Sequence, residues 1–296
     1  MTRIAVIGLG IMGLPMAVNL VRAGFEVTGY NRSPERMGRL EAAGGRPSAS
    51  VAEALTDADV VVTMLPDSPD VQAVMHGEGG VFAHSVAGTL WIDMSTISPD
   101  SARALAASAR EAGLRPLDAP VSGGEQGAID AALSIMVGGA VEDVVSADEI
   151  LRSVGRTIVH VGPSGSGQTV KAANQLIVAA NIEALAEAVV FLESQGVDLD
   201  AALTVLAGGL AGSKVLDQKG AKMATGDFRP GFRLRLHHKD LGIVVDAARQ
   251  AGAYIPVGSL VAQLVTNAVA RGDGDLDHSA LLREVMAGSP AHPRTA

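Results

Sequence analysis

The chain has 296 residues, 48% of them hydrophobic, and a formal net charge of −9 at pH 7. This length predicts two domains or one large one, with ample apolar content for a core. The lack of cysteine excludes disulfides and thiol chemistry, and the acidic balance argues against a nucleic-acid partner.

The first predicted strand, residues 3–7, runs directly into a glycine-rich turn and then an apolar helix pattern that ends near Gly24. The turn consists of Gly8, Leu9, Gly10, Ile11, Met12 and Gly13. In such a unit the glycines allow a tight turn and let a pyrophosphate approach the backbone. The helix N-terminus offers free N–H groups to the phosphates. We therefore predict that these six residues bind a dinucleotide; the alternative is a glycine-rich turn without a ligand.

The second predicted strand, residues 25–30, is followed by Asn31, Arg32 and Ser33, with no carboxylate among them. A carboxylate at this place would hold the ribose 2′-hydroxyl of NAD, whereas an arginine accommodates the 2′-phosphate of NADP. Arg32 can stack on adenine and pair with the phosphate, with Asn31 and Ser33 as donors. The sequence thus favours NADP over NAD; the alternative is a solvated Arg32.

Buried strands are predicted at residues 60–65 and 90–94, and a helix at residues 99–113. Strands that alternate with helices predict a doubly wound, Rossmann-type parallel sheet covered on both faces. Ligands bind beyond the carboxyl ends of such strands. The candidate cofactor contacts there are Met64, Leu65, Pro66 and Thr96. For the first two, packing in the sheet core is equally expected.

A strand predicted to end at Pro120 leads into a turn of Ser122, Gly123 and Gly124. Such a turn can aim consecutive N–H groups and a hydroxyl at one anion, and a small carboxylate would fit. The alternative is a plain connecting turn.

Strand patterns at residues 134–137 and 157–161 complete the predicted sheet, so we place a domain boundary near Gly162. The prediction is a dinucleotide-binding domain at residues 1–163 and an all-helical domain at residues 164–296. Later helices are predicted at residues 201–207, 213–223, 239–250, 257–270 and 278–286, before a frayed tail from residue 288.

The helix after the turn at residues 161–167 is apolar nearly all round, which predicts burial on every side. Lys171 and Asn174 lie near its start, one turn apart on the same face. A buried lysine needs an anionic partner, a shifted pKa or a function. Such an apolar helix needs more cover than the few later helices supply, so we expect a homodimer or homotetramer.

The same helix contains Asn181, Glu183 and Glu187, which argue against a membrane span. A strand pattern begins at residue 3, so we expect no signal peptide and a cytoplasmic protein. His237 and His238 are adjacent, and adjacent helical side chains point about 100° apart, so we expect no metal site.

Four motifs resemble, in order and spacing, the β-hydroxyacid dehydrogenase family. They are the glycine turn at residues 8–13, DAPVSGG at 118–124, GxGxxxKxxN at 165–174, and KDL at 239–241. The resemblance covers nearly the whole chain. It implies a Rossmann-type domain joined by a long interdomain helix to a helical domain, and NAD(P)H-dependent reduction of a small carboxylate-bearing aldehyde. Finer detail, including SGGE at 122–125, resembles the tartronate semialdehyde (2-hydroxy-3-oxopropionate) reductase branch, whose product is glycerate.

The resemblance also implies residue roles. Lys171 would be the general acid, with a pKa lowered toward 7–8 by burial and by Lys239, and Asn174 would orient the substrate or the ammonium. The turn at 122–124 would hold the substrate carboxylate. Gln175, where hydroxyisobutyrate enzymes usually have a second asparagine, would complete the substrate site with Lys239, which would also reach the cofactor.

Other functions stay open on the same scaffold. They are oxidation of 3-hydroxyisobutyrate, reduction of succinic semialdehyde or of an imine, and dinucleotide binding without catalysis. Imine reductases usually lack the lysine, so Lys171 argues against that activity. For Lys171 and Lys239 the alternative role is a structural or solvated cation.

Overall fold

The structure is a computed structural model that describes residues 1–289, and the chain divides into two compact units, Met1–Lys171 and Ala172–Ala296. The predicted boundary near Gly162 falls at the end of strand β9 (Gly155–Gly162), whereas the units divide within helix α9 (Ser166–Ser194). The predicted frayed tail lies mostly at residues 290–296, outside the described residues.

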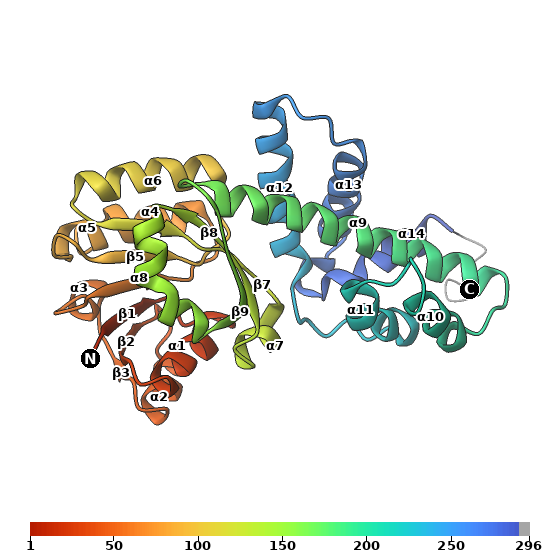
Figure 1. Cartoon of the computed structure of the whole chain (residues 1–296). Coiled ribbons are helices and arrows are strands. Elements are labelled where there is room, and N and C mark those ends of the chain that lie inside the picture. Colours follow the sequence, from red (N-terminus) through yellow and green to blue (C-terminus); the bar gives the residue numbers. More distant parts are fainter. Residues whose placement is uncertain (290–296) are drawn as a thin grey trace. The chain divides into compact units, whose positions relative to one another are not determined.

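Unit 1 is built on a nine-stranded sheet in the order β3-β2-β1-β4-β5-β6-β8-β7, with β9 paired to β8 (Figure 1). The other strands are β1 (Arg3–Ile7), β2 (Glu26–Tyr30), β3 (Arg46–Pro47), β4 (Val60–Thr63), β5 (Leu90–Asp93), β6 (Arg115–Asp118), β7 (Val121–Ser122) and β8 (Leu133–Gly139). Strands β1 to β6 are parallel, and β8 runs antiparallel to β6 and β7. This order confirms the predicted Rossmann-type fold, with its topological switch point between β1 and β4.

Helices cover both faces of this sheet because alternate strand residues face opposite ways. Along β1, Ile4 and Val6 join a core cluster with α1 and α8, whereas Ala5 and Ile7 join a second cluster with α4, α5 and α6. The helices of unit 1 are α1 (Gly13–Arg22), α2 (Met37–Ala42), α3 (Val51–Ala54), α4 (Ser68–His76), α5 (Val81–His84), α6 (Pro99–Glu111), α7 (Gly124–Ile129) and α8 (Val141–Arg152). Burial on both faces fixes the strand ends, and with them the turns that carry the candidate site.

Unit 2 is all helical, as predicted. It contains most of α9, together with α10 (Leu199–Ala207), α11 (Lys214–Thr225), α12 (Leu234–Ala251), α13 (Pro256–Ala270) and α14 (Leu282–Ala287). Helix α12 begins five residues before the predicted start at Lys239, so that lysine lies in its second turn rather than at its first residue.

A buried ion pair joins the elements of unit 2. Lys219 Nζ donates to both carboxylate oxygens of Asp277 at 3.0 Å, and the backbone N–H of Gly231 donates to Oδ2 at 2.8 Å. Burial opposes ionisation of Asp277, but the ammonium and the hydrogen bonds outweigh it and hold the pKa of Asp277 below its usual value. The carboxylate therefore fixes α11 against the segment that leads into α12.

The predicted burial of α9 on every side is wrong for the single chain. Ile182 and Val189 belong to the core of unit 2, but Ile177 and Phe191 are 59% and 64% exposed. Residues 14 apart lie on nearly the same side of a helix, so the neighbouring helices leave one apolar side uncovered. Within residues 1–289, α9 is the one helix long and apolar enough to span a membrane, and 44% of its most apolar window is buried inside the protein.

Candidate active site

The glycine turn between β1 and α1 has the shape that a dinucleotide requires. A Cβ atom added at Gly8 would lie 2.3 Å from Met64 O, and one added at Gly13 would lie 1.9 Å from Gly8 O. At Gly10, by contrast, no atom lies within 4 Å of such a Cβ. The outer glycines thus permit the tight turn and the close helix packing, and the middle one leaves the backbone open to a pyrophosphate. The residues present therefore fit NAD(P).

Asn31 holds this turn from the end of β2. Its Oδ1 accepts a hydrogen bond from the Leu9 backbone N–H at 3.0 Å, and its Nδ2 donates to Ser33 O at 2.9 Å. Both ends of the amide are engaged in shaping the turn, which gives Asn31 a positioning role. Arg32 is exposed and makes no ion pair with any residue that the structure describes. Phosphate binding by Arg32 and Ser33 stays a prediction.

The segments that follow β4 and β5 are hydrogen-bonded to neighbouring residues at the carboxyl edge of the sheet. The Met64 N–H donates to the last residue of β1 at 2.9 Å, and the Leu65 N–H donates to Ser95 Oγ at 2.9 Å. Pro66 and Thr96 follow these residues in the chain. The predicted cofactor contacts after β4 and β5 thus lie at the carboxyl edge, where the fold class binds its ligand.

The carboxylate of Asp118, at the end of β6, caps α9. It accepts from the backbone N–H groups of Gly165 at 2.7 Å and Gln168 at 3.0 Å. The Gln168 side chain in turn donates to Ser95 O at 2.8 Å and accepts from the Ile97 N–H at 3.2 Å. Burial raises the pKa of Asp118 against the opposing effect of the hydrogen bonds. The start of α9 is therefore fixed to the carboxyl ends of β5 and β6.

Lys171 lies within the first two turns of α9, and it is only 6% exposed. Its Nζ donates to Val121 O at 2.8 Å. Val121 directly precedes the Ser122–Gly124 turn, in which Gly123 has φ +142° and Gly124 has φ +65°, so both positions favour glycine. These glycines begin α7, where backbone N–H groups have no helical acceptor. Unit 1 thus brings the predicted acid beside the predicted carboxylate turn.

In unit 2, three other predicted residues meet around a buried carboxylate. Asn174 Nδ2 donates to Gln175 Oε1 at 2.8 Å, and Gln175 Nε2 donates to Asp240 Oδ2 at 2.5 Å. Lys239 Nζ pairs with Asp240 Oδ1 at 2.9 Å. Asp240 is 3% exposed, and its carboxylate contacts both the amide of Gln175 and the ammonium of Lys239.

His237, which precedes His238 in the chain, forms a buried pair with His278. His237 Nδ1 lies 3.2 Å from His278 Nδ1, and His237 Nε2 lies 3.3 Å from Gln175 O. Burial lowers the pKa of His278 well below its usual value, and His237 and Lys219 act in the same direction. Over residues 1–289, no three His, Asp or Glu side chains gather as metal ligands.

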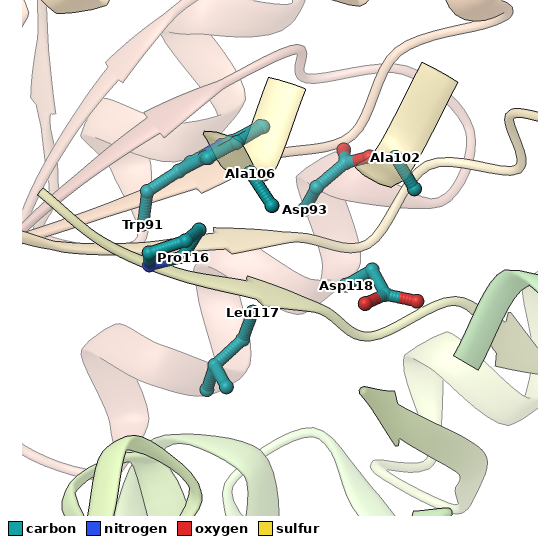
Figure 2. A pocket seen from close by; sticks show the side chains of 7 residues that line it. All are labelled: Trp91, Asp93, Ala102, Ala106, Pro116, Leu117 and Asp118. Atoms are coloured by element: carbon teal, nitrogen blue, oxygen red, sulfur yellow. The ribbon is translucent and has the colours of Figure 1, made fainter. Parts of the chain in front are cut away.

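A small cavity of about 10 Å³, the space of roughly one water, lies beside Asp93 and Asp118 (Figure 2). Asp93 Oδ1 accepts from Thr63 Oγ1 at 2.8 Å and from the Ser95 N–H at 3.2 Å, and Trp91 Nε1 donates to Thr63 Oγ1 at 3.0 Å. Asp93 Oδ2 is buried without a hydrogen-bond partner in the described structure. Burial raises the pKa of Asp93 to about 6.

Sequence reasoning missed the positioning roles of Asp118, Gln168 and Asp240, and the pairing of His237 with His278. Gln168, the third residue of α9, stands where helices commonly carry a capping side chain, and this was an available signal. The other contacts join residues 41 to 65 positions apart, and no local pattern reports them.

Comparison with known families agrees with this geometry. Residues 3–162 match the family described as the NAD binding domain of 6-phosphogluconate dehydrogenase. Residues 165–285 match the family described as NAD-binding of NADP-dependent 3-hydroxyisobutyrate dehydrogenase. The chain is therefore an NAD(P)-dependent oxidoreductase that acts on a CH–OH group.

Individual relatives refine this class. The chain is 40% identical to 2-hydroxy-3-oxopropionate reductase of Escherichia coli, over 96% of this chain and 98% of that protein. It is 36% identical to NAD-dependent L-serine dehydrogenase of Pseudomonas aeruginosa, over 94% and 96% of the two chains. A structure of Mycobacterium tuberculosis 3-hydroxyisobutyrate dehydrogenase with L-serine matches with a TM-score of 0.88 and 37% identity, over 96% and 99% of the chains. The chain belongs to the β-hydroxyacid dehydrogenase family.

Replacing Gly10 by alanine should weaken NAD(P)H binding by about tenfold or more, a loss of about 1.4 kcal/mol or more. The added methyl meets no protein atom within 4 Å, so the fold should be retained, but it occupies the approach to the backbone. Cofactor fluorescence titration and thermal unfolding measure the two effects. Gly38→Ala in α2, also without an atom within 4 Å, is the matched control. Equal cofactor affinity of the two variants would contradict binding at this turn.

Asp93→Asn should stabilise unit 1 more at pH 7.5 than at pH 4.5, by about 2 kcal/mol. The folded-state pKa of Asp93, about 6, lies above the ordinary 3.8, so ionisation costs stability as pH rises from about 4 to 6, and the cost persists above that. Urea unfolding followed through Trp91, the single tryptophan, reports on this unit. Asp148→Asn on the exposed side of α8 is the control. The same offset at both pH values would disprove the raised pKa.

Proposed function

We propose that this enzyme reduces tartronate semialdehyde (2-hydroxy-3-oxopropionate) reversibly to glycerate, with Lys171 as the general acid and base. The substrate assignment is supported by the 40% identity to the Escherichia coli reductase of that name. It is also supported by Gln175, which stands where the hydroxyisobutyrate enzymes usually have a second asparagine.

One observation carries the catalytic proposal: the 2.8 Å hydrogen bond from Lys171 Nζ to Val121 O. It fixes the amine beside the Ser122–Gly124 turn, in a buried place where a lysine needs a partner or a function. A carboxylate held by that turn has its neighbouring carbons within reach of the same amine. The arrangement suits a short acid that carries its reactive carbon close to the carboxylate.

When bound, NAD(P)H supplies the hydride that adds to the carbonyl carbon. The Lys171 ammonium donates a proton to the carbonyl oxygen, which becomes a hydroxyl, and in oxidation the neutral amine takes the proton back. The Ser122 hydroxyl and the N–H groups of Gly123 and Gly124 hold the substrate carboxylate. Asn174 and Lys239 orient the substrate, and Gln175 acts through its hydrogen bond with Asn174.

We assign cofactor binding to the glycine turn at residues 8–13, to Met64–Pro66, to Thr96 and to Lys239. Arg32 and Ser33 would hold a 2′-phosphate, so we propose that NADP is preferred over NAD. The uncovered apolar side of α9 at Ile177 and Phe191 supports the homodimer or homotetramer that we predict. A cytoplasmic location likewise stays our proposal.

Lys171→Ala should lower kcat about 100-fold or more, because proton transfer by a positioned group is typically worth that much. Lys171→Arg should be almost as slow, since the guanidinium keeps the charge but its pKa lies far above the neutral range, which makes it a poor acid. Initial rates of semialdehyde reduction measure kcat, and cofactor titration shows whether each variant still binds NAD(P)H. A variant without Lys171 that keeps more than about a tenth of the wild-type kcat would refute the acid role.

Among short substrates, tartronate semialdehyde should give the highest kcat/KM. Reduction rates with NADPH and with NADH should be compared for tartronate semialdehyde, methylmalonate semialdehyde, succinic semialdehyde and a cyclic imine. Oxidation of L-serine and 3-hydroxyisobutyrate completes the set, because relatives carry those names. A site that hydrogen-bonds the 2-hydroxyl discriminates strongly against analogues that lack it. A higher kcat/KM for another of these substrates would make that compound the assigned substrate. Equal rates with NADH and NADPH would contradict the proposed NADP preference.

A further inference from the structure

We propose that Asp240 is a positioning residue that sets the direction of a hydrogen-bond chain through Gln175, so that Asn174 offers its carbonyl oxygen Oδ1 to the ligand. The chain runs from Asp240 Oδ2 to Gln175 Nε2 at 2.5 Å, and from Gln175 Oε1 to Asn174 Nδ2 at 2.8 Å. This inference rests on the proposed function only for the identity of the ligand.

The direction follows from the chemistry of the groups. An ionised carboxylate can only accept hydrogen bonds, so the group that Gln175 turns to Asp240 must be its NH₂. A planar amide carries its oxygen on the other branch, and Gln175 Oε1 therefore faces Asn174. Because Oε1 accepts, Asn174 must turn its own NH₂ to Gln175. One carboxylate thus decides the orientation of two amides that could otherwise flip.

Lys239 strengthens this control. Its ammonium pairs with Asp240 Oδ1 at 2.9 Å, which leaves Oδ2 for Gln175. Asp240 and Gln175 are 3% and 5% exposed, so bulk water does not compete for these bonds. Hydrogen bonds to a charged group are stronger than those between neutral groups, which makes the carboxylate the fixed end of the chain.

The orientation of the Asn174 amide determines which kind of ligand group can bind there. An amide oxygen accepts hydrogen bonds, so it attracts a hydroxyl or an ammonium hydrogen and repels a carbonyl or carboxylate oxygen. Asn174 is therefore matched to the hydroxyl of a hydroxyacid rather than to its carboxylate.

The test reverses the direction of this hydrogen-bond chain with one substitution and restores it with a second. In Asp240→Asn the new amide turns its oxygen to Lys239 and its NH₂ to Gln175, which must flip and in turn flip Asn174. Adding Gln175→Glu places a carboxylate that accepts both from the new amide and from Asn174 Nδ2. The double variant therefore restores the orientation of Asn174 with the same net charge as the wild type. Gln175→Glu alone places two carboxylates in contact. This single variant completes the double-mutant cycle.

We expect Asp240→Asn to lower kcat/KM for the best substrate by about tenfold or more, the usual scale for one misdirected buried hydrogen bond. The double variant should recover to within about threefold of the wild type, and Gln175→Glu alone should be the slowest or least stable. Asp246→Asn, an exposed carboxylate on the same helix, should stay within about twofold of the wild type. A double variant no faster than Asp240→Asn would overturn the inference, because mere loss of packing is not repaired by a second change.

Thermal unfolding of the same variants keeps the inference testable without turnover. Asp240→Asn should lower Tm and the double variant should regain most of the loss, whatever the substrate. If the wild type turns over none of the short acids but Tm is regained, the proposed function fails and the hydrogen-bond direction stands. If the wild type is active but neither Tm nor kcat/KM is regained, the direction fails and the function stands.

Discussion

The buried carboxylate of Asp118 is the contact on which the candidate site depends. It accepts the free N–H groups at the start of α9 and so joins that helix to the carboxyl end of β6. A charge at a helix N-terminus is favoured by the helix dipole, which offsets part of the cost of burying it. The helix then carries Lys171 to the Val121 carbonyl. This cap and the Gln168 side chain, which contacts Ser95 and Ile97, together hold the start of the helix that carries the lysine.

The Rossmann-type fold was predictable because its signals are local. Runs such as Val60–Thr63 are buried on both faces and read as strands from their own residues. The glycine turn was recognisable for the same reason, since a Cβ at Gly13 would collide with Gly8 O, only five residues earlier in the chain. The parallel part of the sheet followed from the alternation of strands and helices, whereas the antiparallel course of β8 beside β6 and β7 was not predicted.

The rest of the site depends on side chains that meet across the sequence. Asp118 could be read as part of a motif, but its partners Gly165 and Gln168 lie about 50 positions away. The same holds for Gln175 and Asp240, which meet only when α9 and α12 pack. Within one chain α9 is not buried on every side, because composition gives the apolarity of a helix and not the number of neighbours that cover it.

Helix α9 passes without interruption from one unit into the other, and the division falls between Lys171 and Asn174. A loop at such a junction tolerates inserted residues, whereas each residue added to a helix turns everything beyond it by about 100°. A single deletion between these two side chains would place them about 200° apart, on nearly opposite faces of the helix. Evolution can therefore lengthen or shorten this enzyme in its surface loops, while the first turns of α9 must keep their length.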